Sequence, residues 1–242
     1  MSEDLQLAAK VHYGFLPDDF DDDRLNIAIS LRPLHALGGD YCSILPLGKD
    51  RILVAICDAV GHGVSAALFA ARINTYILTQ ARPDLIPCDL VADLNAYLCK
   101  RLGDTGMYTT FYALLLDFES GNMSLTGAAH PPVLQLQQGQ ERCREWESII
   151  TYLGIADPMP LLCGSERLPL KTGDRFLIYS DGLIEVEDVA GQAFGIERLS
   201  RSFIAHRHLS GQALNQAILS EAESYAGFGF QDDVLLMSIT LK

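Results

Sequence analysis

Three apolar segments of this sequence each border an aspartate, and this pattern limits the fold more than any other feature. They place Asp58 after ILVAIC, Asp181 after FLIYS and Asp232 just before DVLLMSI. An apolar run that meets an acidic residue and a glycine-rich turn predicts a buried strand that carries a carboxylate to the rim of a sheet. We therefore expect the three carboxylates to share one site.

Such a group of carboxylates needs a cation. Carboxylates that lie close together repel one another and raise each other's pKa unless a cation holds them. All the donors are oxygens, which indicates a hard ion, Mg²⁺ or Mn²⁺. Asp40 follows two glycines at the start of a strand in LGGDYCS, and His130 stands at a turn in GAAHPP, although each is weak evidence by itself.

The composition indicates one sizeable domain without a nucleic-acid partner. The chain has 242 residues, 49% of them hydrophobic, and a formal net charge of -13. This length favours one large core over two small ones, and the negative charge disfavours nonspecific binding to nucleic-acid phosphates. No apolar run approaches the ~20 residues that span a bilayer, and the N-terminus lacks the pattern of a secretory signal. We therefore expect a soluble, cytoplasmic protein with no membrane span.

The six cysteines are scattered along the chain and form no Cys-x-x-Cys pair. This spacing predicts reduced, buried thiols in a cytosolic protein, in preference to disulfides or zinc ligands. The residues are Cys42, Cys57, Cys88, Cys99, Cys143 and Cys163.

Strands and helices are expected in an order that lacks the regular alternation of a βαβ fold. Alternating or continuous apolar runs predict strands at 25–33, 40–47, 51–58, 109–117, 123–128, 133–137, 173–181 and 232–242. Helical spacing predicts helices at 64–80, 87–102, 194–207 and 210–227. This order favours an α+β fold, with antiparallel sheets covered by helices, over a doubly wound parallel sheet.

A short amphipathic helix is expected before the main domain. Apolar residues recur at near-helical spacing within 3–15, and the helix should end at Leu16-Pro17. We therefore divide the chain into a linker-type helix at 1–17 and a domain at 18–242. The helix is either the tail of a linker from an upstream domain, a contact of a homodimer, or a helix that packs on its own domain.

The segment CDAVGHGVSAA is the densest motif. Asp58 ends a strand, Gly61 and Gly63 permit backbone conformations closed to other residues, and the following helix directs its N-terminus toward the carboxylate. His62, taken alone, is more often a hydrogen-bonded turn residue than a catalyst. The sequence has neither a Gly-x-Ser-x-Gly elbow nor a Walker-type phosphate loop.

Read in order, the motifs resemble one enzyme family along the whole chain. They are LAAKVHYGFLP, LRPLHALGGDY, ILVAICDAVGHGVSAALFA, TTFYALLLD, AAHPPVL, GDRFLIYSDGLIEVED, FGIERL and QDDVLLMSI. They are similar to the metal-dependent serine/threonine protein phosphatases (PPM, type 2C), in particular the bacterial branch typified by stage II sporulation protein E and the RsbU-type regulators. The resemblance implies an αββα sandwich of two antiparallel sheets flanked by helices.

The resemblance also implies a metal site, with two Mn²⁺ or Mg²⁺ ions. Asp58 would bridge the ions, the carbonyl of Ala59 would bind one of them, and Asp181 and Asp232 would complete the carboxylate set. Asp40 would act through metal-bound water. Catalysis would use a metal-activated water and no protein nucleophile. No substrate-binding residue is identified.

Three positions depart from the family pattern, and one of them is Leu235, which replaces a threonine common after the final pair of aspartates. Ser43 stands where many members of the branch have a second aspartate, so we expect a peripheral metal near it to be held weakly. His62 falls two places later than the histidine of the type 2C motif Asp-Gly-His-Gly, so a role as general acid does not transfer.

The main functional hypothesis is a protein serine/threonine phosphatase. By resemblance, its substrate would be a phosphorylated anti-sigma-factor antagonist of the STAS type, and an upstream sensory or receiver domain would set its activity. The alternative is a catalytically silent, phosphatase-like adaptor that binds a regulatory partner. Three mutually repelling carboxylates favour the enzyme. A metal-dependent nucleotide phosphodiesterase is disfavoured because a basic groove and His-Asp ligand clusters are missing.

Overall fold

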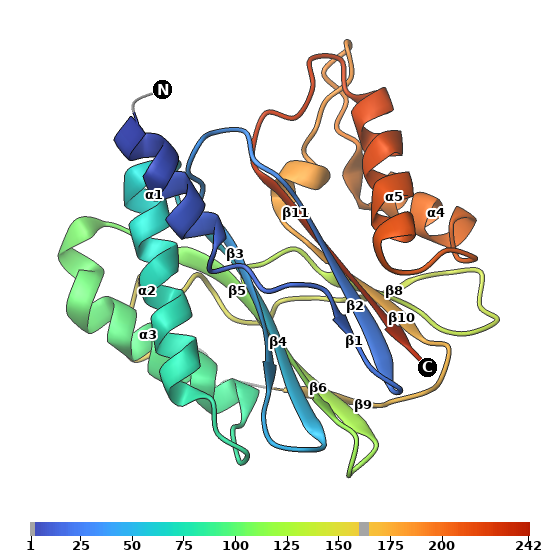
Figure 1. Ribbon diagram of the computed structural model, residues 1–242, viewed down its shortest axis with the longest axis horizontal. Helices are drawn as coiled ribbons and strands as arrows, with labels where there is room; N and C mark the ends of the chain where they lie inside the picture. Colours follow the sequence, from blue (N-terminus) through green and yellow to red (C-terminus); the bar gives the residue numbers. More distant parts are fainter. Residues whose placement is uncertain (1–2, 160–164) are drawn as a thin grey trace. The chain divides into compact units, whose positions relative to one another are not determined.

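The computed structural model describes residues 3–159 and 165–242, which fall into two compact units (Figure 1). Unit 1 contains Met1–Pro17, His35–His130 and Glu147–Leu170. Unit 2 contains Asp18–Leu34, Pro131–Trp146 and Lys171–Lys242. Each unit has its own antiparallel sheet and its own helices.

The sheet of unit 1 has the strand order β3-β4-β5-β6-β9, and every pairing in it is antiparallel. Its strands are β3 (Asp40–Pro46), β4 (Arg51–Ala59), β5 (Thr109–Asp117), β6 (Asn122–Ala128) and β9 (Glu166–Pro169). Its helices are α1 (Glu3–Tyr13), α2 (Val64–Gln80), α3 (Pro87–Leu102) and the short 3-10 helix η1 (Gly103–Thr105).

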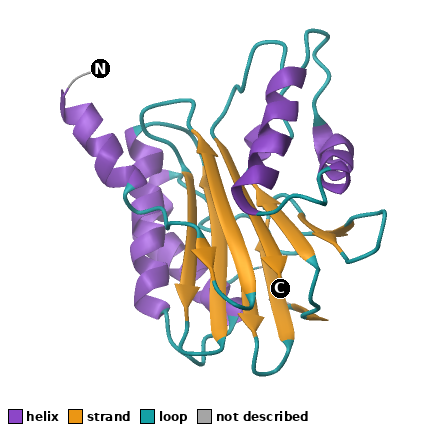
Figure 2. Cartoon of the chain, turned by 45° about the vertical axis from the view of Figure 1, so that its right-hand side comes forward, coloured by secondary structure: helices purple, strands orange, loops and turns teal. Residues whose placement is uncertain are grey.

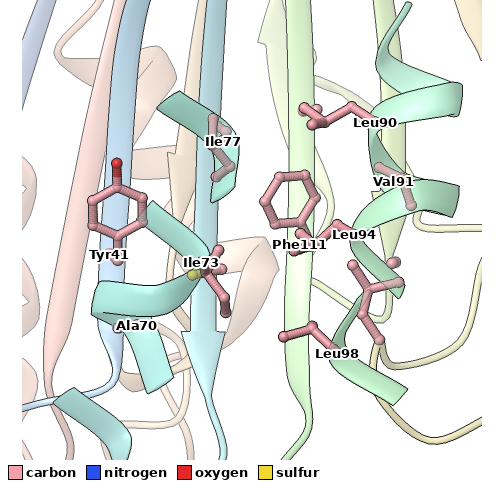
Figure 3. Packing of buried hydrophobic residues seen from close by; sticks show 14 of the residues in the cluster. Tyr41, Ala70, Ile73, Ile77, Leu90, Val91, Leu94, Leu98 and Phe111 are labelled. Atoms are coloured by element: carbon pink, nitrogen blue, oxygen red, sulfur yellow. The ribbon is translucent and has the colours of Figure 1, made fainter. Parts of the chain in front are cut away.

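Helices α2 and α3 cover one face of this sheet. Pro87 begins α3, where its missing N–H breaks no helical hydrogen bond. Figure 3 shows Leu90, Leu94 and Leu98 of α3 pointing toward Phe111 of β5, and all four are buried. Each such side chain contributes about 1.5 to 3 kcal/mol through burial. The i, i+4 spacing of the leucines thus fixes the face that α3 turns to the sheet.

Alternation along β4 decides which of its residues face the helices. Leu53, Ala55 and Cys57 belong to the core that α2 and α3 cover. Because successive side chains of a strand point to opposite faces, Asp58 lies on the other face of the sheet. Its register partner on β3 is Asp40, which shares that face.

The sheet of unit 2 has the order β1-β2-β11-β10-β7-β8 and is also antiparallel throughout its described pairings. Its strands are β1 (Phe20–Asp21), β2 (Leu25–Arg32), β7 (Val133–Leu136), β8 (Arg144–Trp146), β10 (Arg175–Tyr179) and β11 (Val234–Leu241). Its helices are the 3-10 helix η2 (Asp181–Leu183), α4 (Gly195–Ala205) and α5 (Gly211–Tyr225).

The core of unit 2 lies between its sheet and the pair α4 and α5, which Figure 2 shows as purple helices beside orange strands. Leu214 and Ile218 of α5 and Phe203 of α4 are buried with Leu177 of β10 and Leu236 of β11. The central strands β10 and β11 are thereby held rigidly up to the ends where the predicted aspartates stand.

The structure confirms the predicted α+β class, with two antiparallel sheets flanked by helices. All the predicted helices and strands are present, with ends that differ by a few residues. The strands β1, β8 and β9 were not predicted, because each has only two to four residues and none of them contains an apolar pattern like the VLQL of the equally short strand β7. No helix in the described part of the chain is long and apolar enough to cross a membrane.

The prediction of reduced cysteines is wrong at one described position. Cys88 is disulfide-bonded, whereas Cys42, Cys57, Cys99 and Cys143 are free. Spacing along the chain could not predict this, because a disulfide depends on the approach of two Cα atoms in space. The prediction for Cys163 lies outside the described residues.

Candidate metal centre

In unit 1, two of the predicted carboxylates are neighbours on adjacent strands. Asp40 and Asp58 are directly opposite each other in the register of β3 and β4. Side chains at such positions have Cβ atoms about 4.5 to 5.5 Å apart. Asp40 is buried, with 5% of its surface exposed, and Asp58 is half-buried. Two adjacent carboxylates with little access to water repel each other, and a cation bound between them would relieve that repulsion.

The backbone carbonyl of Ala59, also a predicted ligand, is closely approached by Gly39. A Cβ atom at Gly39 would stand 2.5 Å from the Ala59 oxygen. The Ala59 N–H in turn donates to the Gly39 oxygen at 3.3 Å. Gly39 therefore has to lack a side chain for the Ala59 carbonyl to take its place. In the sequence, Gly39 is recognisable only as the second glycine of the GGD motif, and the motif does not indicate its contact with Ala59.

Two threonines of β5 hold the main chain of Asp58. The Asp58 N–H donates to Thr110 Oγ1 at 3.2 Å. The hydroxyl hydrogen of Thr109 is shared between the Asp58 oxygen, 2.8 Å from Thr109 Oγ1, and the Thr110 oxygen, 2.7 Å from it. Both polar groups of the Asp58 backbone are thus tied to neighbouring side chains. This fixes the direction in which the carboxylate leaves the strand.

The structure contradicts the expectation that Ser43 lies near the metal. Ser43 stands three residues after Asp40 in β3, whose pairing with β4 is continuous from Asp40 to Pro46. Residues three apart in a strand point to opposite faces. Ser43 is therefore buried on the face away from Asp40, with 3% of its surface exposed. The comparison with the family motif was misleading here, because it matched positions along the sequence without considering that side chains of a strand alternate between two faces.

The glycines of the GHG segment have the conformations expected of them. Gly61 and Gly63 have φ values of 84° and 81°, which side chains rarely adopt, and α2 begins immediately afterwards. The imidazole of His62 lies 4.8 Å from that of His35, centroid to centroid. His35 is a neighbour that the sequence pattern gave no reason to select.

In unit 2, Asp181 and Asp232 are electrostatic neighbours. Asp181 begins the 3-10 helix that follows β10, and Asp232 stands in the turn before β11. Burial raises the pKa of Asp181, and the nearby Asp232 carboxylate raises it further. This repulsion is what a bound cation would relieve.

Gly182 allows these two segments to approach. A Cβ atom there would stand 2.2 Å from the Asp233 oxygen and 3.2 Å from the Asp232 Cβ. Ser180 fastens the same junction, since its Oγ accepts the Leu235 N–H at 2.9 Å. Gly182 therefore allows close packing against residues 232–233, in addition to forming the turn after β10.

The adjacent acids Asp232 and Asp233 have different environments. Asp233 is buried, and its Oδ1 accepts the Leu34 N–H at 2.7 Å. Asp232 is exposed, and its Oδ1 accepts the Asp233 N–H at 2.7 Å. Asp233 is thus committed to the protein's own backbone, which leaves Asp232 as the carboxylate that can serve a ligand.

Glu185 is a further acidic residue of this group, and the motifs did not single it out. Its N–H donates to the Asp181 oxygen at 2.9 Å, so one helical turn brings it back toward Asp181. Partial burial and the carboxylates of Asp181 and Asp232 raise the pKa of Glu185. In the sequence, the position of Glu185 four residues after Asp181 is the feature that could have indicated that the two side chains are neighbours.

The predicted ligands fall into two pairs, Asp40 with Asp58 in unit 1 and Asp181 with Asp232 in unit 2. Among the described residues, no three His, Cys, Asp or Glu side chains are grouped closely enough to hold a metal ion. All these donors are oxygen atoms, which suits Mg²⁺ or Mn²⁺.

Comparisons with known proteins relate the chain to one family. The family model described as Stage II sporulation protein E (SpoIIE) matches residues 48–242. The chain is similar to the phosphoserine phosphatase RsbU of Bacillus subtilis, with 22% identity over 245 residues that cover 100% of the chain and 71% of that protein. The chain spans 41%, 71% and 45% of the length of three curated relatives that it matches. The family resemblance predicted from the motifs is thereby confirmed.

Solved structures share the fold at low sequence identity. The SiaA-PP2C domain of Pseudomonas aeruginosa superposes with a TM-score of 0.85 and 19% identity, over 99% of this chain and 96% of that one. RsbX in complex with magnesium superposes with a TM-score of 0.69 and 15% identity, over 93% of this chain and 98% of that one. At these identities the similarity establishes the fold.

Proposed function

Since the chain belongs to the stage II sporulation protein E (SpoIIE) family, we propose that it is a metal-dependent protein serine/threonine phosphatase. The observation that carries this proposal is that each unit presents two neighbouring carboxylates at or near the ends of adjacent strands. An adaptor that only binds a partner has no physical need for such repelling pairs. The name of the similar protein RsbU, a phosphoserine phosphatase, supports the same activity.

The proposed metal ligands are the Asp58 carboxylate, the Ala59 carbonyl, Asp181 and Asp232, with Asp40 acting through bound water. We propose that they hold two Mn²⁺ or Mg²⁺ ions. The donor set fits such ions, since it contains only oxygen atoms and since burial and a neighbouring negative charge together raise the pKa of Asp181. Bound divalent ions would supply a water of lowered pKa and would orient and neutralise a phosphoryl group.

The chain's own residues prepare this chemistry. Thr109 and Thr110 fix the backbone of Asp58, so its carboxylate needs little reorganisation to meet a cation. Gly39 leaves the Ala59 carbonyl its space. Glu185 adds negative charge beside Asp181 and Asp232, and we propose that it helps to hold cations or their water.

The test is hydrolysis of an aryl phosphate with Mn²⁺, with and without a chelator. We expect activity that the chelator abolishes and that Asp58→Asn reduces by about two orders of magnitude or more, because the variant keeps the size of the side chain but loses its charge. Asp104→Asn, at an exposed acid of η1, is the matched control and should retain full activity. A chelator-resistant rate, or an active Asp58→Asn variant, would argue against the proposal.

Metal binding should also stabilise the protein. A ligand that binds only the folded state raises its stability, by about 2.7 kcal/mol at a concentration of 100 times Kd. Millimolar Mn²⁺ should therefore raise the melting temperature, and Asp58→Asn should reduce this shift. An unchanged melting curve of the unsubstituted protein would favour the silent adaptor.

We propose that the substrate is a phosphorylated anti-sigma-factor antagonist of the STAS type. The similarity to RsbU supports this choice. The test is release of phosphate from a serine-phosphorylated STAS protein, with a phosphoserine peptide of unrelated sequence as control. Equal rates on both would contradict a specific STAS substrate.

We further propose that residues 1–17 act as a linker-type helix ahead of a phosphatase domain at 18–242, and that an upstream sensory or receiver domain controls activity in the cytoplasm. The greater length of the relatives supports such a domain. Activity measured with and without a natural upstream segment tests the control, and imaging of a fluorescent fusion tests the location.

We propose that α1 forms a homodimer contact. Leu7 and Val11 of α1 are 62% and 56% exposed, and Leu68 of α2 is 64% exposed. They line an apolar groove of about 400 Å³ within unit 1, which a second copy of α1 could fill. Leu7→Asp should convert a dimer to a monomer in light-scattering measurements, whereas Val189→Asp, at an exposed apolar residue of unit 2, should not.

A further inference from the structure

His130, in the segment GAAHPP, is a buried histidine that follows a residue with a strained backbone conformation. The residue before it, Ala129, has a φ of 50°, and it is the one residue other than glycine with a positive φ in the described part of the chain. A residue with a Cβ atom is unfavourable in this region, so it persists only where the surroundings enforce it. Such outliers gather at functional sites, which is a reason to ask what His130 does.

The backbone on both sides of this residue is firmly held. The Ala129 N–H donates to the Ile150 oxygen at 2.8 Å. The His130 N–H donates to Ser148 Oγ at 3.1 Å, and the same hydroxyl donates to the His130 oxygen at 2.7 Å. These bonds maintain the strained turn and direct the imidazole inward, where only 3% of the residue is exposed.

The imidazole reaches the segment that carries Asp58 through one hydroxyl group. His130 Nδ1 lies 2.8 Å from Thr110 Oγ1, and that oxygen accepts the Asp58 N–H at 3.2 Å. A hydroxyl oxygen accepts up to two hydrogen bonds and donates one, so Thr110 Oγ1 can accept the Asp58 N–H and still direct its own hydrogen to Nδ1 in the tautomer whose Nδ1 carries no hydrogen. The other acceptor near this hydroxyl, the Asp58 oxygen, is more distant at 3.5 Å.

We propose that His130 is a positioning residue for the metal centre. By accepting the Thr110 hydroxyl hydrogen, it orients the hydroxyl so that a lone pair meets the Asp58 N–H. This fixes the Cys57–Asp58 peptide, and with it the point at which the Asp58 carboxylate leaves the strand. The inference rests on the proposed function, in which that carboxylate binds metal.

A purely structural role would make a different prediction. The His130 ring also contacts the Tyr112 ring edge-on, with centroids 6.4 Å apart, so its removal would disturb packing in any case. Packing alone does not depend on whether the replacement side chain can accept a hydrogen bond at the position of Nδ1. If His130 is a positioning residue, the affinity for metal does depend on that hydrogen bond.

The experiment measures Mn²⁺ binding in the metal-free protein from the electron paramagnetic resonance signal of free Mn²⁺. His130→Leu should weaken binding by about 10-fold to 100-fold, the usual effect of losing a group that orients a metal ligand. His130→Asn, whose amide oxygen can replace Nδ1, should restore binding to within about threefold of the unsubstituted protein. His130→Gln, whose acceptor lies farther along the side chain, should not.

The Thr110 variants test the second step of the same connection. Thr110→Val should weaken Mn²⁺ binding as His130→Leu does, and Thr110→Ser should retain it. Because both residues act through one hydroxyl, the double variant should be little weaker than the poorer single variant. Thr126→Val is the matched control, since Thr126 is a buried strand threonine of unit 1 whose hydroxyl bonds to Ser165.

The outcomes separate this inference from the proposed function. If Asp58→Asn abolishes Mn²⁺ binding but folded His130→Leu binds normally, the role of His130 is wrong and the metal centre stands. If Asp58→Asn binds normally, the metal centre itself is wrong. If His130→Leu does not fold, the comparison of His130→Asn with His130→Gln decides, and equal affinities for these two overturn the proposal.

Discussion

The contact of Gly39 with the Ala59 carbonyl yields the sharpest prediction. Gly39 has no positive φ, so alanine is compatible with its backbone, and any effect of Gly39→Ala is steric. The added Cβ would stand 2.5 Å from the Ala59 oxygen, and the ordinary contact distance begins at 3.4 Å. The carbonyl or the strand must therefore move by about 0.9 Å, and the obstacle is backbone, which cannot turn aside as a side chain can.

Two effects of different size should follow. Overpacking of this kind destabilises a protein by about 1 to 3 kcal/mol. A displacement near 1 Å at a catalytic group reduces the rate by about 100-fold. We therefore expect Gly39→Ala to fold, to unfold at moderately lower urea concentration, and to lose most of its Mn²⁺-dependent activity on an aryl phosphate. The Mn²⁺ concentration for half-maximal activity should rise.

Gly103→Ala is the matched control for this variant. Gly103 is also in unit 1 and has a right-handed helical conformation, and a Cβ atom added there would meet no other atom within 4 Å. Alanine there should leave activity unchanged and stabilise the fold by about 0.4 to 1 kcal/mol. If Gly39→Ala is destabilised but keeps its activity and metal requirement, the Ala59 carbonyl is not a metal ligand. If neither stability nor activity changes, the close contact itself is refuted.

Three further predictions concern stability. The pKa values of Asp181 and Glu185 are raised in the folded protein, so metal-free stability is retained below their ordinary values of 3.8 and 4.5 and is lost as pH rises through the raised values. The gain in stability from Asp181→Asn, measured by urea unfolding with chelator, should therefore grow from about pH 4 to about pH 7; a constant difference would contradict this. Ala129→Gly should stabilise the protein by about 1 kcal/mol, since it relieves a left-handed residue; a loss in the same assay would oppose the strain argument. Ser43→Asp should destabilise the fold, because it buries a charge, and should not lower the Mn²⁺ requirement; tighter Mn²⁺ binding would restore Ser43 to the metal site.

The fold was largely predictable because its long elements have clear periods. The strand predicted at 109–117 and the helix predicted at 87–102 match β5 and α3 residue for residue. In α3 the apolar residues recur with the helical period over several turns, and in β5 they form a continuous buried run, and tertiary contacts reinforce both patterns. The disulfide at Cys88 had no local signal and was missed.

The candidate site shows where local patterns stop being informative. Glu185 has the sequence context of a solvated loop acid, yet partial loss of hydration and the carboxylates of Asp181 and Asp232 raise its pKa. Asp232 and Asp233 are both aspartates next to each other in the sequence, and they are distinguished in the structure by burial and by the hydrogen bond that Asp233 accepts from Leu34. That bond joins residues 199 positions apart, so no sequence window contains both partners.

The sequence by itself determined that carboxylates stand at the ends of buried strands, because a strand's composition and its glycine turn are local properties. It also determined the family, through the order of its motifs. The tertiary structure alone decided which face Ser43 occupies, how closely Gly39 approaches Ala59, and that the His130 ring meets Thr110. These facts depend on strand register and backbone conformation, which arise when distant segments pair and which leave no periodic trace in the chain.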